Sequence, residues 1–208
     1  IGDFSRPYAV PLTQQSRLII FDSSFVGFRK LKQEDPVYKI YATQMQEADR
    51  LASQGPQSFY INHHPILGLT PRPTPTGLQA YPGNAALQSV LDDIRPRLLF
   101  PSQVQALLAG HVHVFQMASF DHEHPTQFIS GNGGSSVEDP NLTIVPAGLD
   151  AAPDLPIRHF TTTNVFGFMT MQRDQGEWWY EARNHQGEIL ARCDLVKRIG
   201  QCSPEQLN

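Results

Sequence analysis

Histidines occur in this chain at two places where a buried strand is expected to end. His111 and His113 follow the apolar run 104–109, and His63 follows a second such run at 58–61. Side chains two residues apart on a strand point the same way, so the rings of His111 and His113 are expected on one side of the chain. Neutral imidazole is a good ligand for zinc, iron and manganese ions. The spacing therefore predicts a metal site at the rim of a sheet, with one ion or with two ions roughly 3.5–4 Å apart.

The elements that would position these histidines are strands with helices between them. Pro36 suits the first turn of a helix over 36–54, where apolar residues recur at helical spacing, and Gly55-Pro56 stops it. Asn84 can cap a shorter helix that extends to about Ile94. Short apolar runs predict the strands. These strands are expected at 17–21, 58–61, 103–109 and 127–130, with 114–120 as a continuation of the third.

The last third of the chain has a different pattern. Three strands are expected at 166–173, 178–184 and 189–196, and tight turns join them into an antiparallel meander. Alternating strands and helices followed by a meander favour a single α/β domain over 1–208, a sandwich with mixed sheets. The proline-rich stretches 66–83 and 140–156 are expected to be long ordered loops.

Composition excludes several classes of function. The 208 residues are enough for one substantial core, and 40% of them are hydrophobic. The net charge is -4 and no basic stripe occurs, so nucleic acid is not an expected partner. No apolar run approaches the ~20 residues that cross a bilayer, so no membrane partner is expected either. The chain starts at Ile1 rather than at a methionine, and we expect it to be processed or to belong to something longer.

Two histidine blocks resemble a known family. Asn62-His63-His64-Pro65 and Gly110-His111-Val112-His113 are similar to the last two signature blocks of the calcineurin-like metallophosphoesterases, which include the purple acid phosphatases. The Gly-rich segment 130–134 is similar to the segment after the next strand in several of those enzymes. The resemblance spans roughly residues 15–140 and implies a calcineurin-like α/β/β/α sandwich, with the meander continuing the second sheet.

The resemblance also implies a ligand set. Two ions of iron, zinc or manganese share a bridging ligand at the edge of the sandwich in that family. By the same resemblance, His63 and His111 would bind one ion and His113 the other. His64 would face the substrate phosphate or lie behind the ligands, and it is the catalytic candidate.

The earlier blocks of that family are missing from this chain. They read Asp-x-His, Gly-Asp-x-x-Asp and Gly-Asn-His-Asp/Glu, but the first histidine here is His63, and Gly2-Asp3 lacks the second aspartate. We therefore expect the chain to be the C-terminal half of a phosphoesterase whose N-terminal half supplies the acidic ligands. Three histidines bind one ion without an anionic bridge, so the chain alone is expected to hydrolyse phosphoesters poorly or not at all.

Three functions remain open from the residues. The leading hypothesis is a hydrolase that cleaves phosphomonoesters or diesters of small molecules or proteins through a metal-bound hydroxide. Its substrate cleft should lie among the loops at 64–82, 111–116 and 131–160. The second is a mononuclear zinc protein with three histidine ligands and an open position for water. The third is a non-catalytic binding module whose histidines are structural.

Other polar groups have simpler interpretations. The segment 121–124, Asp-His-Glu-His, could mimic a metal cluster, but a solvated turn is the favoured interpretation. His159 is expected to be structural and His185 to be exposed in a turn. The segment 131–136 lacks the G-x-x-x-x-G-K-S/T pattern of a phosphate-binding loop, so we expect a tight turn near the site.

The two cysteines bear on the compartment. Cys193 and Cys202 fit neither a zinc ribbon nor a thioredoxin-like motif. They form either a local disulfide of an exported protein or two unrelated free thiols. Together with the sparse lysines, the pair favours a secreted or periplasmic protein.

Overall fold

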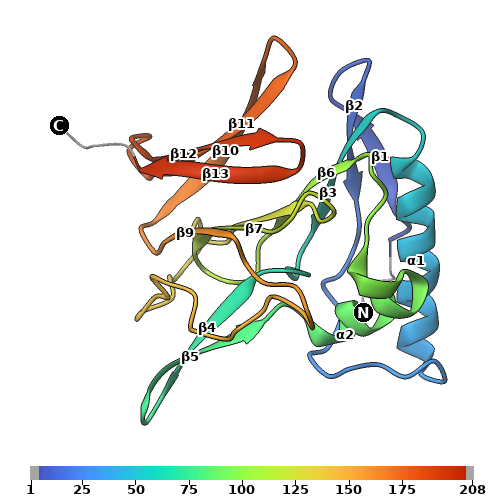
Figure 1. Ribbon diagram of the computed structural model, residues 1–208, viewed down its shortest axis with the longest axis horizontal. Helices are drawn as coiled ribbons and strands as arrows, with labels where there is room; N and C mark the ends of the chain where they lie inside the picture. Colours follow the sequence, from blue (N-terminus) through green and yellow to red (C-terminus); the bar gives the residue numbers. More distant parts are fainter. Residues whose placement is uncertain (1–4, 205–208) are drawn as a thin grey trace.

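The computed structural model describes residues 5–204, so Ile1, Gly2 and Asp3 lie outside the described part. Its central element is a seven-stranded sheet with the strand order β1-β2-β3-β6-β8-β7-β9 (Figure 1). Strands β2, β3, β6 and β8 run parallel, whereas β1 and β7 run antiparallel to their neighbours. The bounds are β1 Tyr8–Pro11, β2 Ser16–Ile20, β3 Gln57–Asn62, β6 Val104–Ala109, β7 Phe115–Ser119, β8 Thr126–Ser130 and β9 His159–Thr163.

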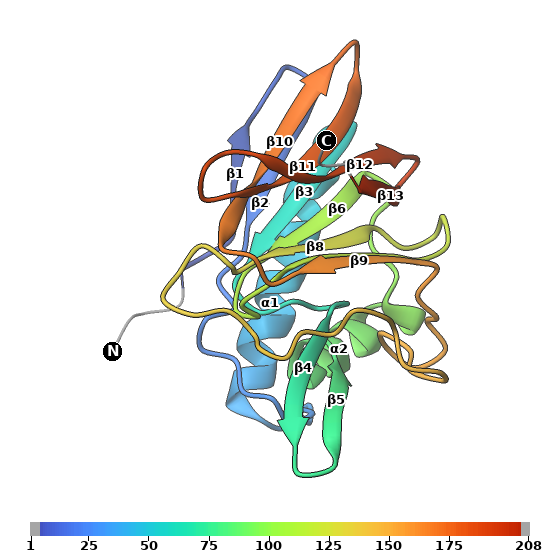
Figure 2. The ribbon, with the colours of Figure 1, turned by 90° about the vertical axis from the view of Figure 1, so that its left-hand side faces the viewer.

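Helices cover one face of this sheet and a second sheet covers the other (Figures 1 and 2). The helical layer consists of α1 (Pro36–Ala52) and α2 (Ala85–Ile94), which continues into the short 3₁₀ helix η1 (Pro96–Leu98). The second sheet has the order β10-β11-β12-β13. Its strands are β10 Gly167–Asp174, β11 Glu177–Asn184, β12 Ile189–Val196 and β13 Ile199–Pro204. The expected mixed α/β sandwich is confirmed, although residues 5–204 contain no helical layer on the outer face of the second sheet.

Apolar side chains on both sides of the central sheet hold the layers together. Tyr41, Met45 and Ala48 lie at successive turns of α1 and pack toward the sheet in one core cluster. A second cluster lies between the two sheets, where the rings of Phe128 and Tyr180 stack with their centroids 4.0 Å apart. The inner strands β3, β6, β8 and β7 are therefore buried on both faces, whereas the edge strands β1 and β9 are more exposed.

Both predicted helices are present. Pro36 occupies the first turn of α1, and the helix ends at Ala52, two residues before the expected end. The side chain of Asn84 accepts a hydrogen bond from the Leu87 N–H at 2.9 Å, so it caps α2 as predicted.

The segment predicted as a loop at 66–83 contains a hairpin instead. It is formed by β4 (Leu69–Thr74) and β5 (Gly77–Pro82), which pair only with each other. Pro71 and Pro73 lie within β4. A two-stranded ribbon tolerates such prolines because one side of each strand needs no N–H donor. The hairpin extends away from the sandwich (Figure 2).

Other strand predictions need correction as well. The run 114–120 is not a continuation of β6, because β8 lies between β6 and β7 in the sheet. Strands β1, β9 and β13 were not predicted. The three meander strands are confirmed within one residue at each end, and the stretch 140–156 is an irregular segment as expected.

The two cysteines are joined across the second sheet. Cys193 and Cys202 face each other directly in the register of β12 and β13 and form a disulfide. The alternative of two free thiols is therefore wrong for this structure. Over the same described residues, none of the helices combines the length and the apolarity that crossing a bilayer demands.

Candidate metal centre

The parallel strands bring the candidate residues to one edge of the central sheet. In the register of β3 and β6, Asn62 lies opposite Ala109, so the residues that follow both strands meet at the same edge. The Gly110 N–H donates to the His63 carbonyl at 3.2 Å, which ties the two strand ends together. His63 and His111 are thus neighbours, although 48 positions separate them along the chain.

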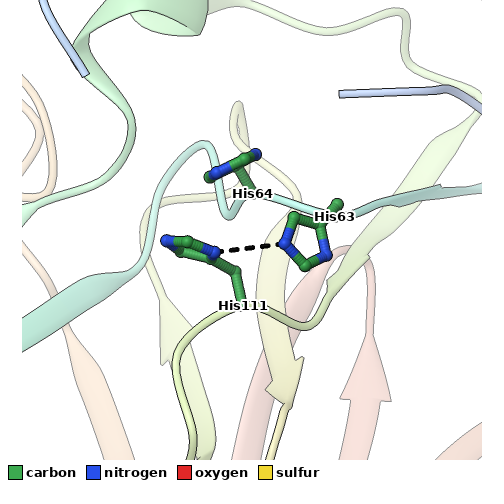
Figure 3. Close-up of side chains that lie close together, drawn as sticks. All are labelled: His63, His64 and His111. Carbon is green, nitrogen blue, oxygen red and sulfur yellow. Dashed lines mark hydrogen bonds between the residues drawn. The ribbon is translucent and has the colours of Figure 1, made fainter. Parts of the chain in front are cut away.

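Three imidazole rings gather at this edge. His63, His64 and His111 each offer a ring nitrogen, and these atoms all lie within 4.8 Å of one another (Figure 3). The Nδ1 of His111 and the Nε2 of His63 are 3.1 Å apart. Two nitrogens bound to one tetrahedral zinc ion at about 2.0–2.1 Å would lie roughly 3.4 Å apart. The donor types and their separation therefore fit a zinc-type metal ion.

A buried backbone contact orients the ring of His64. This side chain is almost fully buried, and its Nδ1 lies 2.7 Å from the carbonyl oxygen of Ser23. Because a carbonyl only accepts, Nδ1 must carry the proton, which leaves Nε2 with a free lone pair. Such a partner behind a histidine is typical of metal ligands. The contact fixes the ring of His64 within the group of three, and its catalytic role stays a prediction.

Asn62 and Ser23 hold the backbone behind the cluster. The hydroxyl of Ser23 accepts hydrogen bonds from the His64 N–H at 2.9 Å and from the Asn62 amide at 3.3 Å. The same amide also donates to the His64 carbonyl. The Oδ1 of Asn62 is buried without a hydrogen-bond partner, so one acceptor beside the histidines is still available.

Two rings of the cluster, those of His64 and His111, have lowered pKa values. Burial, together with the nearby rings of His64, His63 and His113, lowers the pKa of His111 to about 4. Burial also lowers the pKa of His64, although its bond to Ser23 partly opposes this. A metal ion binds deprotonated imidazole, so neutral rings favour binding near neutral pH.

His111 and His113 do not lie on a strand, so the alternation argument for their rings is wrong. Strand β6 ends at Ala109, and two consecutive three-residue turns follow. In these turns the Val112 N–H donates to the Gly110 carbonyl and the Val114 N–H donates to the Val112 carbonyl, both at 2.8 Å. His111 has a φ of 65°, which is uncommon for a residue with a side chain and is often found at functional sites.

His113 is placed apart from the other three rings. It is not part of the group of three nitrogens, and its Nδ1 lies 2.9 Å from the Ser136 hydroxyl. Ser136 belongs to the segment 131–136, which forms turns beside the site as expected. A Cβ on Gly131 would lie 2.1 Å from the Val112 carbonyl oxygen, so glycine is needed for the close approach of the two loops. The role of His113 at a second ion stays a prediction.

Sequence reasoning did not single out Asp22. This residue follows β2 at the same sheet edge, and its charge interacts with His63. The Ser24 hydroxyl chiefly lowers the pKa of Asp22, so the group is a carboxylate at neutral pH. The sequence did contain a signal for this position. Asp22 follows the apolar run of one strand just as His63 follows the run of the next, and the ends of parallel strands meet at one edge of a sheet.

The segment 121–124 forms a turn, but the turn is not fully solvated. His124 is only 2% exposed, and its two ring nitrogens contact Asp121 Oδ1 and the Arg97 carbonyl, each at 2.9 Å. His159 is half-buried on β9, and His185 is exposed in the turn between β11 and β12. The expected turn at 121–124 is present, but its solvation is wrong for His124, whereas the exposed position of His185 is as predicted.

Comparison with known proteins identifies relatives of the fold. The sequence matches no protein-family model and no curated protein. The structure is similar to that of PhoD, with a TM-score of 0.53 and 11% identity over 98% of this chain and 45% of that chain. It is also similar to GAP50, the anchor in the inner membrane complex of Plasmodium, with a TM-score of 0.51 and 13% identity over 94% of this chain and 54% of that chain.

These likenesses concern the fold. The chain spans about half the length of either structure. The mixed seven-stranded sheet packed on an antiparallel sheet is consistent with the purple acid phosphatase and calcineurin-like fold. One of the two neighbours is an anchor, so the fold alone does not establish an activity.

Proposed function

We propose that this chain contributes the histidine side of the active site of a metal-dependent hydrolase of phosphoric esters. The observation that supports this most directly is the convergence of His63, His64 and His111 at the carboxyl edge of parallel strands, in a fold similar to that of PhoD. Ligand sites of open α/β sheets lie at such edges. In this proposal the ions are iron, zinc or manganese.

The roles of the residues follow from their contacts. His63 and His111 hold the first ion, with their nitrogens already at near-ligand separation. His64, oriented by the Ser23 carbonyl, either completes this ligand set or contacts the substrate phosphate. When bound, such ions act as Lewis acids toward phosphate oxygens and lower the pKa of water. His113, held by Ser136, is proposed as a ligand of a second ion.

A binuclear centre needs anionic ligands that the three rings do not supply. We propose that an N-terminal half of the same protein provides them, since the acidic signature blocks of the resembling family have no counterpart in this sequence. Exposed apolar side chains on β1 and near β10 agree with a further layer or segment packing there. They are Tyr8, Val10, Val165, Phe166 and Phe168.

The disulfide suggests where the protein works. Disulfides persist in oxidising compartments, so we propose a secreted or periplasmic protein, in line with the Cys193–Cys202 pair. The proposed substrates are phosphoesters of small molecules or proteins rather than nucleic acid or membrane lipids.

Metal titration tests the proposal. Calorimetric titration of zinc or manganese into the 208-residue chain should find one site, and a longer form of the protein should hold about two ions. The chain alone should turn over p-nitrophenyl phosphate weakly, whereas the longer form should be active. Robust turnover by the chain alone would contradict the need for an acidic half. The absence of metal binding in both forms would contradict the hydrolase itself.

A further inference from the structure

A cavity adjoins the histidine cluster on the side of the β4–β5 hairpin. It has a volume of about 560 Å³, and His64 and His111 form part of its wall. Other parts of the wall come from the hairpin and from Leu149, Asp150, Ala152 and Pro153. This volume lies within the usual range of small-molecule sites, and the wall is mostly apolar. A molecule bound at the histidines therefore has room to extend into this cavity.

Two aromatic side chains of the wall do not belong to a hydrophobic core cluster of the described residues. Phe28 is 57% exposed and Tyr81 is 45% exposed, and both line the cavity. The ring of Phe28 lies 5.7 Å from the rings of both His64 and His111, measured between centroids. Exposed flat rings beside a polar cluster offer stacking surfaces to an aromatic ligand.

Phe28 is held in place although it is exposed. The amide of Asn84 donates to the Gly27 carbonyl at 2.9 Å, and the Leu31 N–H donates to the Ser89 hydroxyl at 3.0 Å. Both bonds fasten the loop around Phe28 to the N-terminal half of α2. A loop anchored in this way loses little backbone entropy when its aromatic residue stacks on a ligand.

The wall also contains cations that are not neutralised. Lys30 and Arg72 line the cavity, and neither forms an ion pair within residues 5–204. The guanidinium carbon of Arg72 lies 5.2 Å from the centre of the Tyr81 ring, so charge and ring are presented together. Asp150 is the acidic residue of this wall. The two cations leave the cavity with an excess of positive charge, suited to an anionic ligand.

We propose that this cavity binds the alcohol portion of the phosphoester, and that it selects a flat aromatic group that bears a further anionic substituent. The proposal rests on the proposed function for the placement of the phosphate at the histidines. Phe28 and Tyr81 contact the ring, and Arg72 with Lys30 contacts the distal anion.

Phosphonates test the cavity without hydrolysis. Methylphosphonate, phenylphosphonate and para-carboxyphenylphosphonate are titrated into the chain by calorimetry or ligand-detected NMR, once with chelator and once with zinc. We expect each aromatic contact to contribute about 2- to 10-fold in affinity, so phenylphosphonate should bind more tightly than methylphosphonate. Phe28→Ala and Tyr81→Ala should each reduce this preference. Arg72→Gln should remove only the added preference for the carboxylated compound.

A matched control separates the cavity from general apolar contacts. Phe168→Ala removes another exposed phenyl ring, 45% exposed and outside the lining of this cavity, and should leave all three affinities unchanged. Equal affinities for methyl and phenyl compounds, or no aryl binding at millimolar concentrations, would overturn the cavity proposal. An aryl preference in a chain that binds no zinc would support the cavity and contradict the proposed hydrolase, so the two failures are distinguishable.

Discussion

Two groups of histidines and nearby polar residues in this molecule differ in how their ring nitrogens are used. In the turn at 121–124, His124 uses both ring nitrogens within the protein, one on Asp121 and one on the Arg97 carbonyl. At the sheet edge, His63 and His111 face each other through ring nitrogens. In the first arrangement both ring nitrogens contact oxygen atoms of the protein, whereas in the second the nitrogens of two imidazoles contact each other.

The contrast shows that residue type does not separate a structural cluster from a ligand cluster. Both groups contain histidine near a carboxylate, since the charge of Asp22 interacts with His63 and Asp121 is hydrogen-bonded to His124. What differs is the direction of the lone pairs and the number of bonds already made. Titratable groups with shifted pKa values gather at functional sites, so the rings that meet at the sheet edge support a functional hypothesis.

The largest expected effect is on metal binding at the sheet edge. His63→Ala should weaken zinc binding at least about 100-fold, more than the 10–100-fold typical of losing an outer partner. His63 is exposed, so the fold should remain intact. Calorimetric zinc titration with circular dichroism as the folding control measures this. Unchanged zinc affinity would place the ion elsewhere.

A second substitution tests the structural role of the turn at 121–124. His124→Ala removes a buried ring and leaves the Arg97 carbonyl without its partner, which should destabilise the fold by about 1–3 kcal/mol. Zinc affinity should not change, because the turn is not part of the histidine group. Urea unfolding and zinc titration of the same variant check both halves. A loss of zinc affinity without a loss of stability would reverse the assignment.

Removal of the Ser23 hydroxyl, which holds the backbone of His64, should have an intermediate effect on zinc affinity. Ser23→Ala removes the hydroxyl that accepts from the His64 N–H and the Asn62 amide, while the backbone carbonyl that contacts His64 Nδ1 remains. We expect about a tenfold loss of zinc affinity. Ser24→Ala is the neighbouring control, since the Ser24 hydroxyl contacts Asp22 rather than the rings. Equal losses in both variants would argue against a specific role for Ser23.

The smallest expected effect is on the pH dependence of stability that Asp121 contributes in the turn at 121–124. Burial raises the pKa of Asp121, but hydrogen bonds from His124 and the Glu123 N–H outweigh it, so the pKa lies below its usual 3.8. A lowered folded pKa contributes stability above the unfolded pKa, and this contribution disappears as the pH falls through the folded value. Asp121→Asn keeps an acceptor oxygen but removes the charge. Its loss of stability relative to the parent chain in urea unfolding should therefore be present at neutral pH and shrink in acid.

Much of the scaffold could be predicted from local pattern. The cap at Asn84, the helix behind Pro36 and the meander strands depend on neighbours within a few residues, and the structure contains them all. Strand β9 was missed because its sequence is mostly threonine and its partner β7 lies far away in the chain. Strands β1 and β13 pair with their neighbours in the sequence, but β1 has only four residues and β13 contains no apolar run. The hairpin in 66–83 was not predicted because prolines argue against a strand, although they are tolerated where a strand has a free edge, as in this two-stranded ribbon.

The sequence by itself determined that histidines would follow two buried strands, because side-chain type and strand-forming runs are local properties. Only the tertiary structure decided which rings meet. The turns after Ala109 give His111 its positive φ, the Ser23 carbonyl turns His64 toward the group, and His113 is drawn to Ser136. The contacts of His64 and His113 join segments more than 20 residues apart, and the positive φ of His111 is a backbone conformation outside the strand. The periodicity of the sequence contains no information about either.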